Sequence, residues 1–171
     1  IEPYLKSAAK HPSVTLKQIG TSFQGQALNS LKIGNGPIKV MMWSQMHGDE
    51  NTATAALMDF LSFITADENA KWLTSWQQKI TLLIIPMVNP DGAAMQTRHN
   101  AQGIDLNRDA KALRTKEGQI LMAVANEFKP DFGFNLHDQN AYYGAGKMGK
   151  QATISVLAPA YNEAREVNKS R

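Results

Sequence analysis

Apolar and polar residues alternate along the first third of the chain in a pattern that predicts strands followed by a helix. Residues Val14–Ile19 and Gln26–Ile33 are predicted to form two strands of an antiparallel meander. The next segment, Ile38–Met46, is mostly apolar on both faces, which is typical of an inner strand covered by helices. Apolar residues at helical spacing from Ala53 to Ile64 then predict a helix. This region is therefore expected to contain a strand-turn-helix unit.

The same alternation of helix and strand continues along the chain. Lys71–Gln78 is predicted to be a helix, Ile80–Val88 a second inner strand, and Asn89–Gly92 the turn that ends it. A further helix is predicted within Arg114–Phe128, and Pro130 prevents its continuation. The remaining predicted elements are two strands and a last helix: Asp131–Leu136, Gln151–Leu157 and Tyr161 onward.

Interleaved strands and helices indicate an α/β fold with a mixed, largely parallel sheet flanked by helices. The chain has no internal repeat, low-complexity tract or linker, so residues 1–171 are predicted to belong to a single domain. In such sheets, ligands bind beyond the carboxyl ends of the strands. His47, Asn89 and His137 each follow a predicted strand. Three strands are thus expected to point at one place.

The composition narrows the possible classes of protein. Hydrophobic residues make up 43% of the chain and charged residues 19%, which suits a folded domain. The formal net charge is only +3 and the lysines are scattered, so nucleic-acid binding is not predicted. No apolar run approaches the ~20 residues that span a bilayer, so the protein is expected to be soluble. The oligomeric state stays open, as does the compartment, with the cytoplasm favoured over an extracytoplasmic location.

Two histidines and a glutamate are candidate metal ligands. The chain has no cysteine, so a metal site must use histidine and carboxylate. His47 and Glu50 lie three residues apart across a strand-to-helix turn, close enough for both to reach one ion at about 2.0–2.2 Å. His137, at a distant strand end, would complete the two-histidine, one-carboxylate set of catalytic zinc. Asp138 is not its expected partner, because adjacent strand residues face opposite ways. The other histidines fall in predicted loops: His11 and His99.

We therefore predict one Zn²⁺ ion, whose chemistry suits hydrolysis of an amide. Chance occurrence of the short motif is the alternative.

The polar segment after the second inner strand offers candidates for substrate binding. An arginine fork matches a carboxylate bidentately, so Asn107 and Arg108 fit a carboxylate clamp. Arg98 would stabilise an oxyanion if it reached a metal-bound carbonyl. Ordinary solvated arginines are the alternative.

Five blocks, in the same order and at similar spacing, give the chain a resemblance to the M14 zinc carboxypeptidase family, the carboxypeptidase A-like metallopeptidases. The resemblance spans about Val14 to His137 and implies a carboxypeptidase-like mixed sheet. The blocks are Ile19–Gln26, His47-Gly48-Asp49-Glu50, Asn89-Pro90-Asp91-Gly92, Arg98–Arg108 and Phe134-Asn135-Leu136-His137.

By position, the resemblance implies a zinc site at His47, Glu50 and His137, an oxyanion stabiliser at Arg98 and terminal-carboxylate binding at Asn107 and Arg108. The implied activity is hydrolysis of the C-terminal peptide bond of peptides. The family's general-base glutamate and substrate-capping tyrosine come late in its domain and have no match here. The candidates that follow His137 too closely are Glu163, Glu166, Tyr142 and Tyr143. We therefore hypothesise that residues 1–171 are an incomplete, N-terminal part of the domain, which binds zinc with little or no turnover.

Two other classes of function stay open. One is hydrolysis of small substrates. These would be acylated amino acids with a free carboxylate, as for the succinylglutamate desuccinylase and aspartoacylase group, or murein peptides, as for an amidase. Asn89-Pro90-Asp91-Gly92 leading into Arg98 favours the carboxypeptidase. The other is a carboxypeptidase-like module that binds without hydrolysis.

Overall fold

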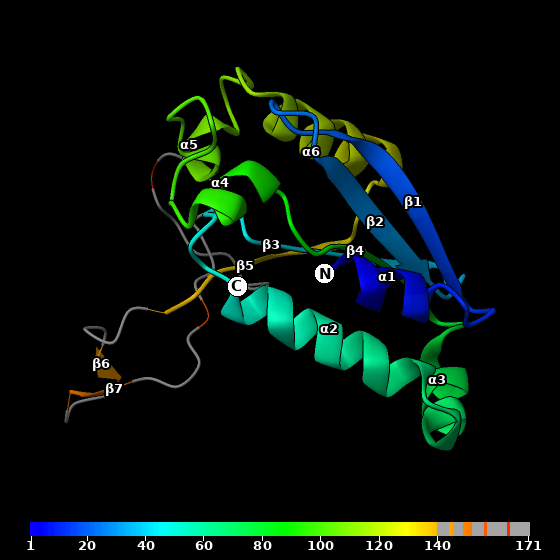
Figure 1. The fold of residues 1–171 in the computed structure, drawn as a ribbon. Coiled ribbons are helices and arrows are strands. Elements are labelled where there is room, and N and C mark those ends of the chain that lie inside the picture. The colour runs from blue at the N-terminus through cyan, green and yellow to red at the C-terminus, as the bar shows by residue number, and fades with distance from the viewer. Residues whose placement is uncertain (140–143, 146–148, 152–155, 157–163, 165–171) are drawn as a thin grey trace. The chain divides into compact units, whose positions relative to one another are not determined.

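The computed structural model describes residues 1–139, 144–145, 149–151, 156 and 164, which divide into two compact units, Ile1–Asp138 and Gln139–Arg171. In the second unit, β6 (Gly144–Ala145) and β7 (Lys150–Gln151) pair antiparallel. The first unit holds all other elements (Figure 1): α1 (Glu2–Ala8), β1 (Val14–Thr21), β2 (Ala27–Ile33), β3 (Ile38–Ser44), α2 (Thr52–Thr65), the 3-10 helix η1 (Asp67–Asn69), α3 (Ala70–Trp76), β4 (Ile80–Ile85), α4 (Pro90–Met95), α5 (Leu106–Asp109), α6 (Lys116–Phe128) and β5 (Phe132–Leu136).

A five-stranded mixed sheet forms the centre of the first unit, with the strand order β1-β2-β4-β3-β5. The pairs β1–β2 and β2–β4 are antiparallel, whereas β3 pairs in parallel with both β4 and β5. The mixed α/β sheet predicted from the sequence is confirmed, and β3 and β4 are inner strands as expected. Because β3, β4 and β5 run in the same direction, their carboxyl ends meet at one edge of the sheet.

Helices cover the two faces of this sheet (Figure 1). Helices α1, α2 and α3 pack on one face, where Leu61 and Ile64 of α2 are completely buried together with Ile84 of β4. Helix α6 packs on the other face, where Leu121 joins a second core cluster with Met41 of β3. Full burial of each such side chain stabilises the fold by about 1.5–3 kcal/mol. Many of the periodic apolar positions in the sequence therefore build the core, among them Leu57, Leu61, Ile64 and Leu121.

The predicted turn at Asn89–Gly92 is wrong, because these residues begin helix α4. The Asn89 side chain accepts a hydrogen bond from the backbone N–H of Gly92 at 2.9 Å, and Pro90 occupies the first helical position. Asparagine and proline favour turns and helix starts alike, so local sequence could not separate the two. Strand β4 also ends at Ile85, just before Pro86, which has no N–H to donate.

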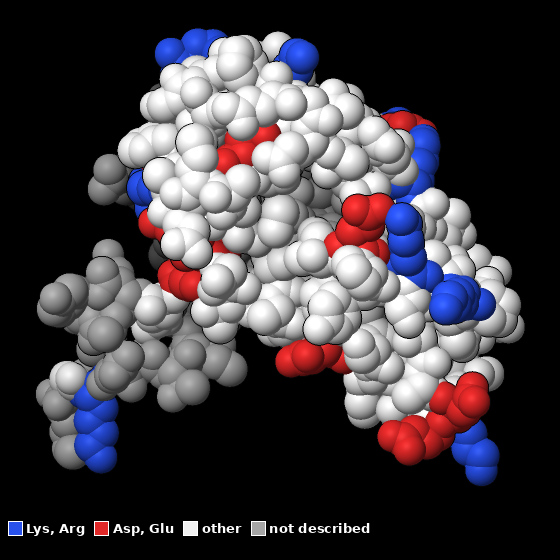
Figure 2. All heavy atoms as spheres, in the orientation of Figure 1, with Lys and Arg blue, Asp and Glu red and all other residues white. Residues whose placement is uncertain are grey.

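Two predictions fall mainly outside the described residues. Of the predicted strand Gln151–Leu157, only Gln151, which lies in β7, and Val156 are described, and of the predicted helix from Tyr161 onward only Ala164. In the described part of the chain, no helix combines the length and apolar character needed to cross a membrane. On the face shown in Figure 2, the described lysine and arginine side chains lie in small separate groups, interspersed with acidic ones.

Candidate metal centre

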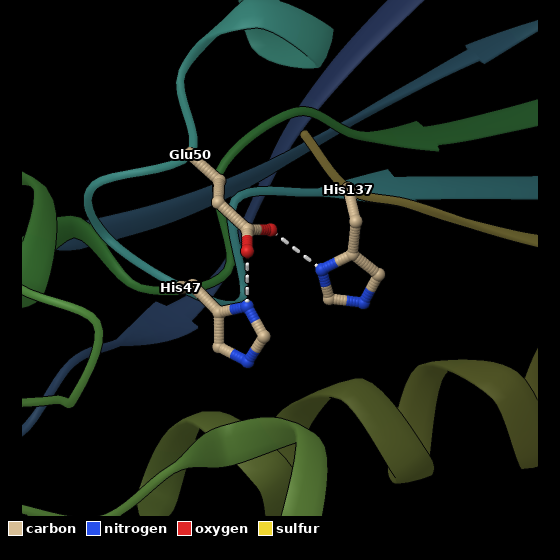
Figure 3. A group of neighbouring side chains, drawn as sticks. All are labelled: His47, Glu50 and His137. Carbon is tan, nitrogen blue, oxygen red and sulfur yellow. Dashed lines mark hydrogen bonds and ion pairs between the residues drawn. The ribbon is translucent and has the colours of Figure 1, made fainter. Parts of the chain in front are cut away.

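The carboxyl ends of two parallel strands and the loop before α2 bring three predicted ligands together. His47 follows β3, His137 follows β5, and Glu50 lies between β3 and α2. Figure 3 shows the Glu50 carboxylate between the two imidazole rings. Its Oε1 lies 2.7 Å from His47 Nδ1, and its Oε2 lies 2.6 Å from His137 Nδ1. The structure therefore brings His47, Glu50 and His137 together, although they are up to 90 residues apart in the chain.

These residues fit a metal ion. Their donor atoms all lie within 4.8 Å of one another, and two imidazoles with one carboxylate are a donor set that zinc uses. His47 is almost fully buried and has a carboxylate at each ring nitrogen, Glu50 at Nδ1 and Asp105 at Nε2, 3.2 Å away. A neutral imidazole carries one N–H and cannot donate to both. A cation at Nδ1 would leave Nε2–H free to donate to Asp105, the arrangement common for metal-binding histidines.

Asp105 connects the ligands to the predicted substrate-binding residues. Its Oδ2 accepts a hydrogen bond from Arg98 Nε at 3.1 Å and lies 3.0 Å from Arg98 Nη2. Its Oδ1 accepts one from the backbone N–H of Asn107 at 2.9 Å and so caps α5. The other Arg98 nitrogen, Nη1, lies 3.7 Å from Glu50 Oε1. The Arg98 guanidinium is thus held beside the candidate metal ligands.

Both carboxylates of this cluster are held in their charged form. Burial raises the pKa of Glu50, but hydrogen bonds from His137 and His47 outweigh it, so the pKa lies below its ordinary value. Burial likewise raises the pKa of Asp105, and hydrogen bonds and charge from Arg98 and His47 bring it below the ordinary value. Negative charge is therefore available to balance a cation at neutral pH.

The predicted carboxylate clamp lies on α5. The side-chain oxygen of Asn107 accepts a hydrogen bond from Asn135 Nδ2 at 3.0 Å, which links α5 to β5. Arg108 is exposed, and its guanidinium makes no hydrogen bond or ion pair with the described residues. Arg108 is therefore accessible to an anion from solution.

The loop that carries His47 and Glu50 is held by tight contacts. Gln45 adopts the left-handed backbone region with a φ of 53° and is buried. Its side chain donates to the Gly48 carbonyl at 2.9 Å and accepts from the Thr54 hydroxyl at 2.8 Å. A Cβ on Gly48 would lie 2.0 Å from the carbonyl carbon of Gly92. Only glycine thus allows the loop to pack so closely against the start of α4.

Two acidic residues that contact the candidate ligands received no role from sequence reasoning. Asp105 precedes Leu106 and has the residue type of a helix N-cap, a signal that could have identified it. Asp138 makes contacts with the start of α2 that no local pattern reveals. The residues that the resemblance left without a role lie outside the described residues: Glu163, Glu166, Tyr142 and Tyr143.

Known proteins resemble the chain in sequence and fold. Carboxypeptidase 2 of Trichophyton rubrum is 28% identical over 132 residues, which cover 76% of this chain and 24% of the relative. Murein peptide amidase A of Escherichia coli is 34% identical over 75 residues, 44% of this chain and 26% of the relative. The chain thus spans about a quarter of the length of these relatives.

Solved structures share the fold. The metallo-carboxypeptidase from Pseudomonas aeruginosa superposes with a TM-score of 0.76 at 19% identity, over 96% of this chain and 52% of that one. The metallo-carboxypeptidase from Burkholderia cenocepacia gives 0.74 at 21% identity, over 80% and 40%. The family model Peptidase_M14, zinc carboxypeptidase, matches residues 1–147. The chain therefore belongs to the zinc carboxypeptidase family, whose metal is zinc.

Proposed function

We propose that this chain carries the zinc-binding and carboxylate-binding part of a metallocarboxypeptidase that hydrolyses the C-terminal peptide bond of peptides. The observation that carries the proposal is the convergence of His47, Glu50 and His137 on one point. These residues would hold one zinc ion, which supplies Lewis-acid chemistry by polarising a carbonyl and activating water. Membership of the zinc carboxypeptidase family supports this choice of metal and reaction.

Three further residues would bind the substrate. Arg98, held by Asp105 beside Glu50, would stabilise the negative charge that develops on the carbonyl oxygen. Asn107 and Arg108 would bind the terminal carboxylate, with Arg108 free to form a bidentate pair. The Pseudomonas aeruginosa relative was solved in complex with a succinic acid derivative, (2-guanidinoethylmercapto)succinic acid, which supports recognition of carboxylates. The general base is not among the residues to which we assign a role.

The clamp is tested by comparing ligands that differ only at the C-terminus. The zinc-loaded chain is titrated with a short peptide that ends in a free carboxylate and with the same peptide as its amide. We expect the free acid to bind more tightly than the amide. We expect Arg108→Ala to raise the dissociation constant of the free acid by about 10-fold or more and to leave that of the amide nearly unchanged. Lys111→Ala removes a nearby positive charge and serves as a control. Equal losses on both peptides would contradict the clamp.

The similarity to murein peptide amidase A favours a second candidate, an amidase or deacylase that acts on small acylated substrates. Assays of the zinc-loaded chain with C-terminally free peptides, murein peptides and N-acyl amino acids separate the two candidates. Release of a C-terminal amino acid supports the carboxypeptidase, and preference for the other substrates supports the alternative. We expect little or no turnover from residues 1–171, for which no general base is assigned. Binding of zinc and carboxylate without hydrolysis is therefore compatible with both a carboxypeptidase and a binding module, whereas hydrolysis of any of these substrates would exclude the binding module.

A further inference from the structure

Helix α2 begins without a cap from its own sequence. The side chain of Asn51, at the N-cap position, makes no capping hydrogen bond. The first backbone N–H groups of a helix have no partner within the helix and need acceptors. Asp138, 86 residues further along the chain, accepts from Thr52 N at 3.1 Å and from Thr52 Oγ1 at 2.9 Å. Its Oδ1 also lies 3.4 Å from Ala53 N. The cap of α2 thus comes from the end of β5.

This cap joins the two segments that carry candidate ligands. Asp138 follows His137 directly, and Thr52 lies two residues after Glu50. The backbone N–H of Asp138 also donates to Glu50 Oε2 at 3.4 Å. The negative charge of Asp138 suits the positive end of the helix dipole, which strengthens the contact. Glu50 and His137 are therefore connected by protein contacts that do not involve the metal.

The connection matters because β5 is weakly held. Among the described strands β5 pairs with β3 alone, and its residues Phe132 and Phe134 are 57% and 47% exposed. A hydrogen bond from Asn135 to Asn107 also links β5 to α5, and the contacts of Asp138 hold the end of β5 to the loop that carries Glu50. A ligand that must be ordered when the metal binds lowers the affinity for the metal.

We propose that Asp138 is a positioning residue for the metal centre, which caps α2 and thereby holds His137 at the right separation from Glu50. The inference rests on the proposed zinc site. Asp138 acts through α2 and is not itself a ligand, because its carboxylate accepts hydrogen bonds from Thr52 and Ala53. It raises zinc affinity by keeping the ligands in place before the ion arrives.

The test measures zinc affinity by competition with a chromophoric chelator, and the visible spectrum of the Co²⁺-loaded chain. For Asp138→Ala we expect zinc to dissociate about 10- to 100-fold more readily, as for other residues that orient metal ligands. The spectrum at saturating Co²⁺ should also change, because the ligand geometry is altered. Asp138→Asn retains an oxygen that can cap a helix and should recover most of the affinity.

Two control variants of α2 separate positioning from stability. Asp59→Ala removes an exposed carboxylate of the same helix, and Ile64→Val weakens the helix at its buried far end. Both should bind zinc as the original chain does. The inference is overturned if Asp138→Ala binds zinc normally, or if Ile64→Val loses as much affinity at a similar melting temperature. If the original chain binds no zinc, or His47→Ala binds it unchanged, the proposed metal site itself fails, and the inference with it.

Discussion

Two pairs of carboxylates in the first unit have different surroundings. Glu50 and Asp105, the site pair, contact histidine and arginine side chains, and their own side chains are 18% and 16% exposed. Asp91 and Glu117, the scaffold pair, are completely buried. Among the described residues, the scaffold pair accepts hydrogen bonds only from neutral donors.

The scaffold pair holds the β1–β2 turn against α4 and α6 through hydrogen bonds. Asp91 accepts from the hydroxyl of Ser22 at 2.6 Å, the side chain of Gln26 at 2.9 Å and the backbone N–H of Gln24 at 3.0 Å. Glu117, in the first turn of α6, accepts from the backbone N–H of Phe23 at 2.8 Å. Asp91 accepts three hydrogen bonds and Glu117 two, all from neutral donors, whereas Glu50 faces two imidazole nitrogens whose proton a metal ion could replace. The hydrogen-bond partners, and not the carboxylates themselves, distinguish the buried structural acids from the acids of the candidate metal centre.

The largest expected effect is a loss of zinc affinity when a partner of the site pair is removed. His47→Ala removes one of the three proposed ligands, and we expect the dissociation constant for zinc to rise by at least about 1,000-fold, on the order of 4 kcal/mol. Isothermal titration calorimetry with zinc measures this. His99→Ala, at an exposed position, is the matched control. Unchanged zinc stoichiometry in His47→Ala would refute the ligand assignment.

The scaffold pair should respond in stability. Asp91→Ala leaves three donors without their acceptor, and we expect the free energy of unfolding of the metal-free chain to fall by about 3 kcal/mol or more. Asp91→Asn keeps one oxygen and should lose less. Urea denaturation measures both. The contrast with the site pair fails if Asp91→Ala is no less stable than Asp59→Ala, which removes an exposed carboxylate.

Gly48 lies between the site pair and the scaffold pair: it belongs to the loop that carries Glu50, and it packs against Gly92, the neighbour of Asp91. A side chain at Gly48 would force the ligand loop away from α4. We expect Gly48→Ala to weaken zinc binding by about 10- to 100-fold, comparable to the loss of a residue that orients a ligand. Gly20→Ala is the control, since its Cβ would meet the tip of the Ile120 side chain, which can move. Equal zinc affinity in both variants would show that the close approach is dispensable.

The smallest expected effect is a pH dependence at Asp109, which is buried like the scaffold pair but contacts Arg114. Burial raises the pKa of Asp109, but hydrogen bonds from Thr115 and from the Arg114 and Thr115 backbone bring it below the ordinary value. A lowered folded-state pKa stabilises the fold fully above the unfolded-state value of about 3.9, and this stabilisation is lost as the pH falls through the folded-state value.

Asp109→Asn should therefore be less stable than the original chain by about 1 kcal/mol at neutral pH, with a shallower loss of stability in acid. Urea denaturation from about pH 7 to about pH 2 compares the two slopes. Identical slopes would mean that Asp109 has the same pKa in the folded and unfolded chains.

Several features of the fold could be predicted because local patterns reflect burial. Apolar residues on both faces of β3 indicated an inner strand. Apolar residues spaced at the 3.6-residue period in α2 and α6 indicated helices that cover the sheet. Residues at the carboxyl ends of β3 and β5 were predicted to meet, and they do. The start of α4 was missed because Asn89 and Pro90 suit a turn equally well. The roles of Arg98, Asn107 and Arg108 remain predictions.

The sequence by itself determined the main strands and helices, the order of the strands along the chain and the three candidate ligands, because each depends on residues close together or on strand direction. Only the tertiary structure showed which aspartates contact the candidate ligands. Asp91, Asp105 and Asp138 are chemically identical, and their roles follow from donors that lie up to 86 residues away. Hydrogen bonds act over about 3 Å, so partners distant in sequence become visible only when the chain is folded.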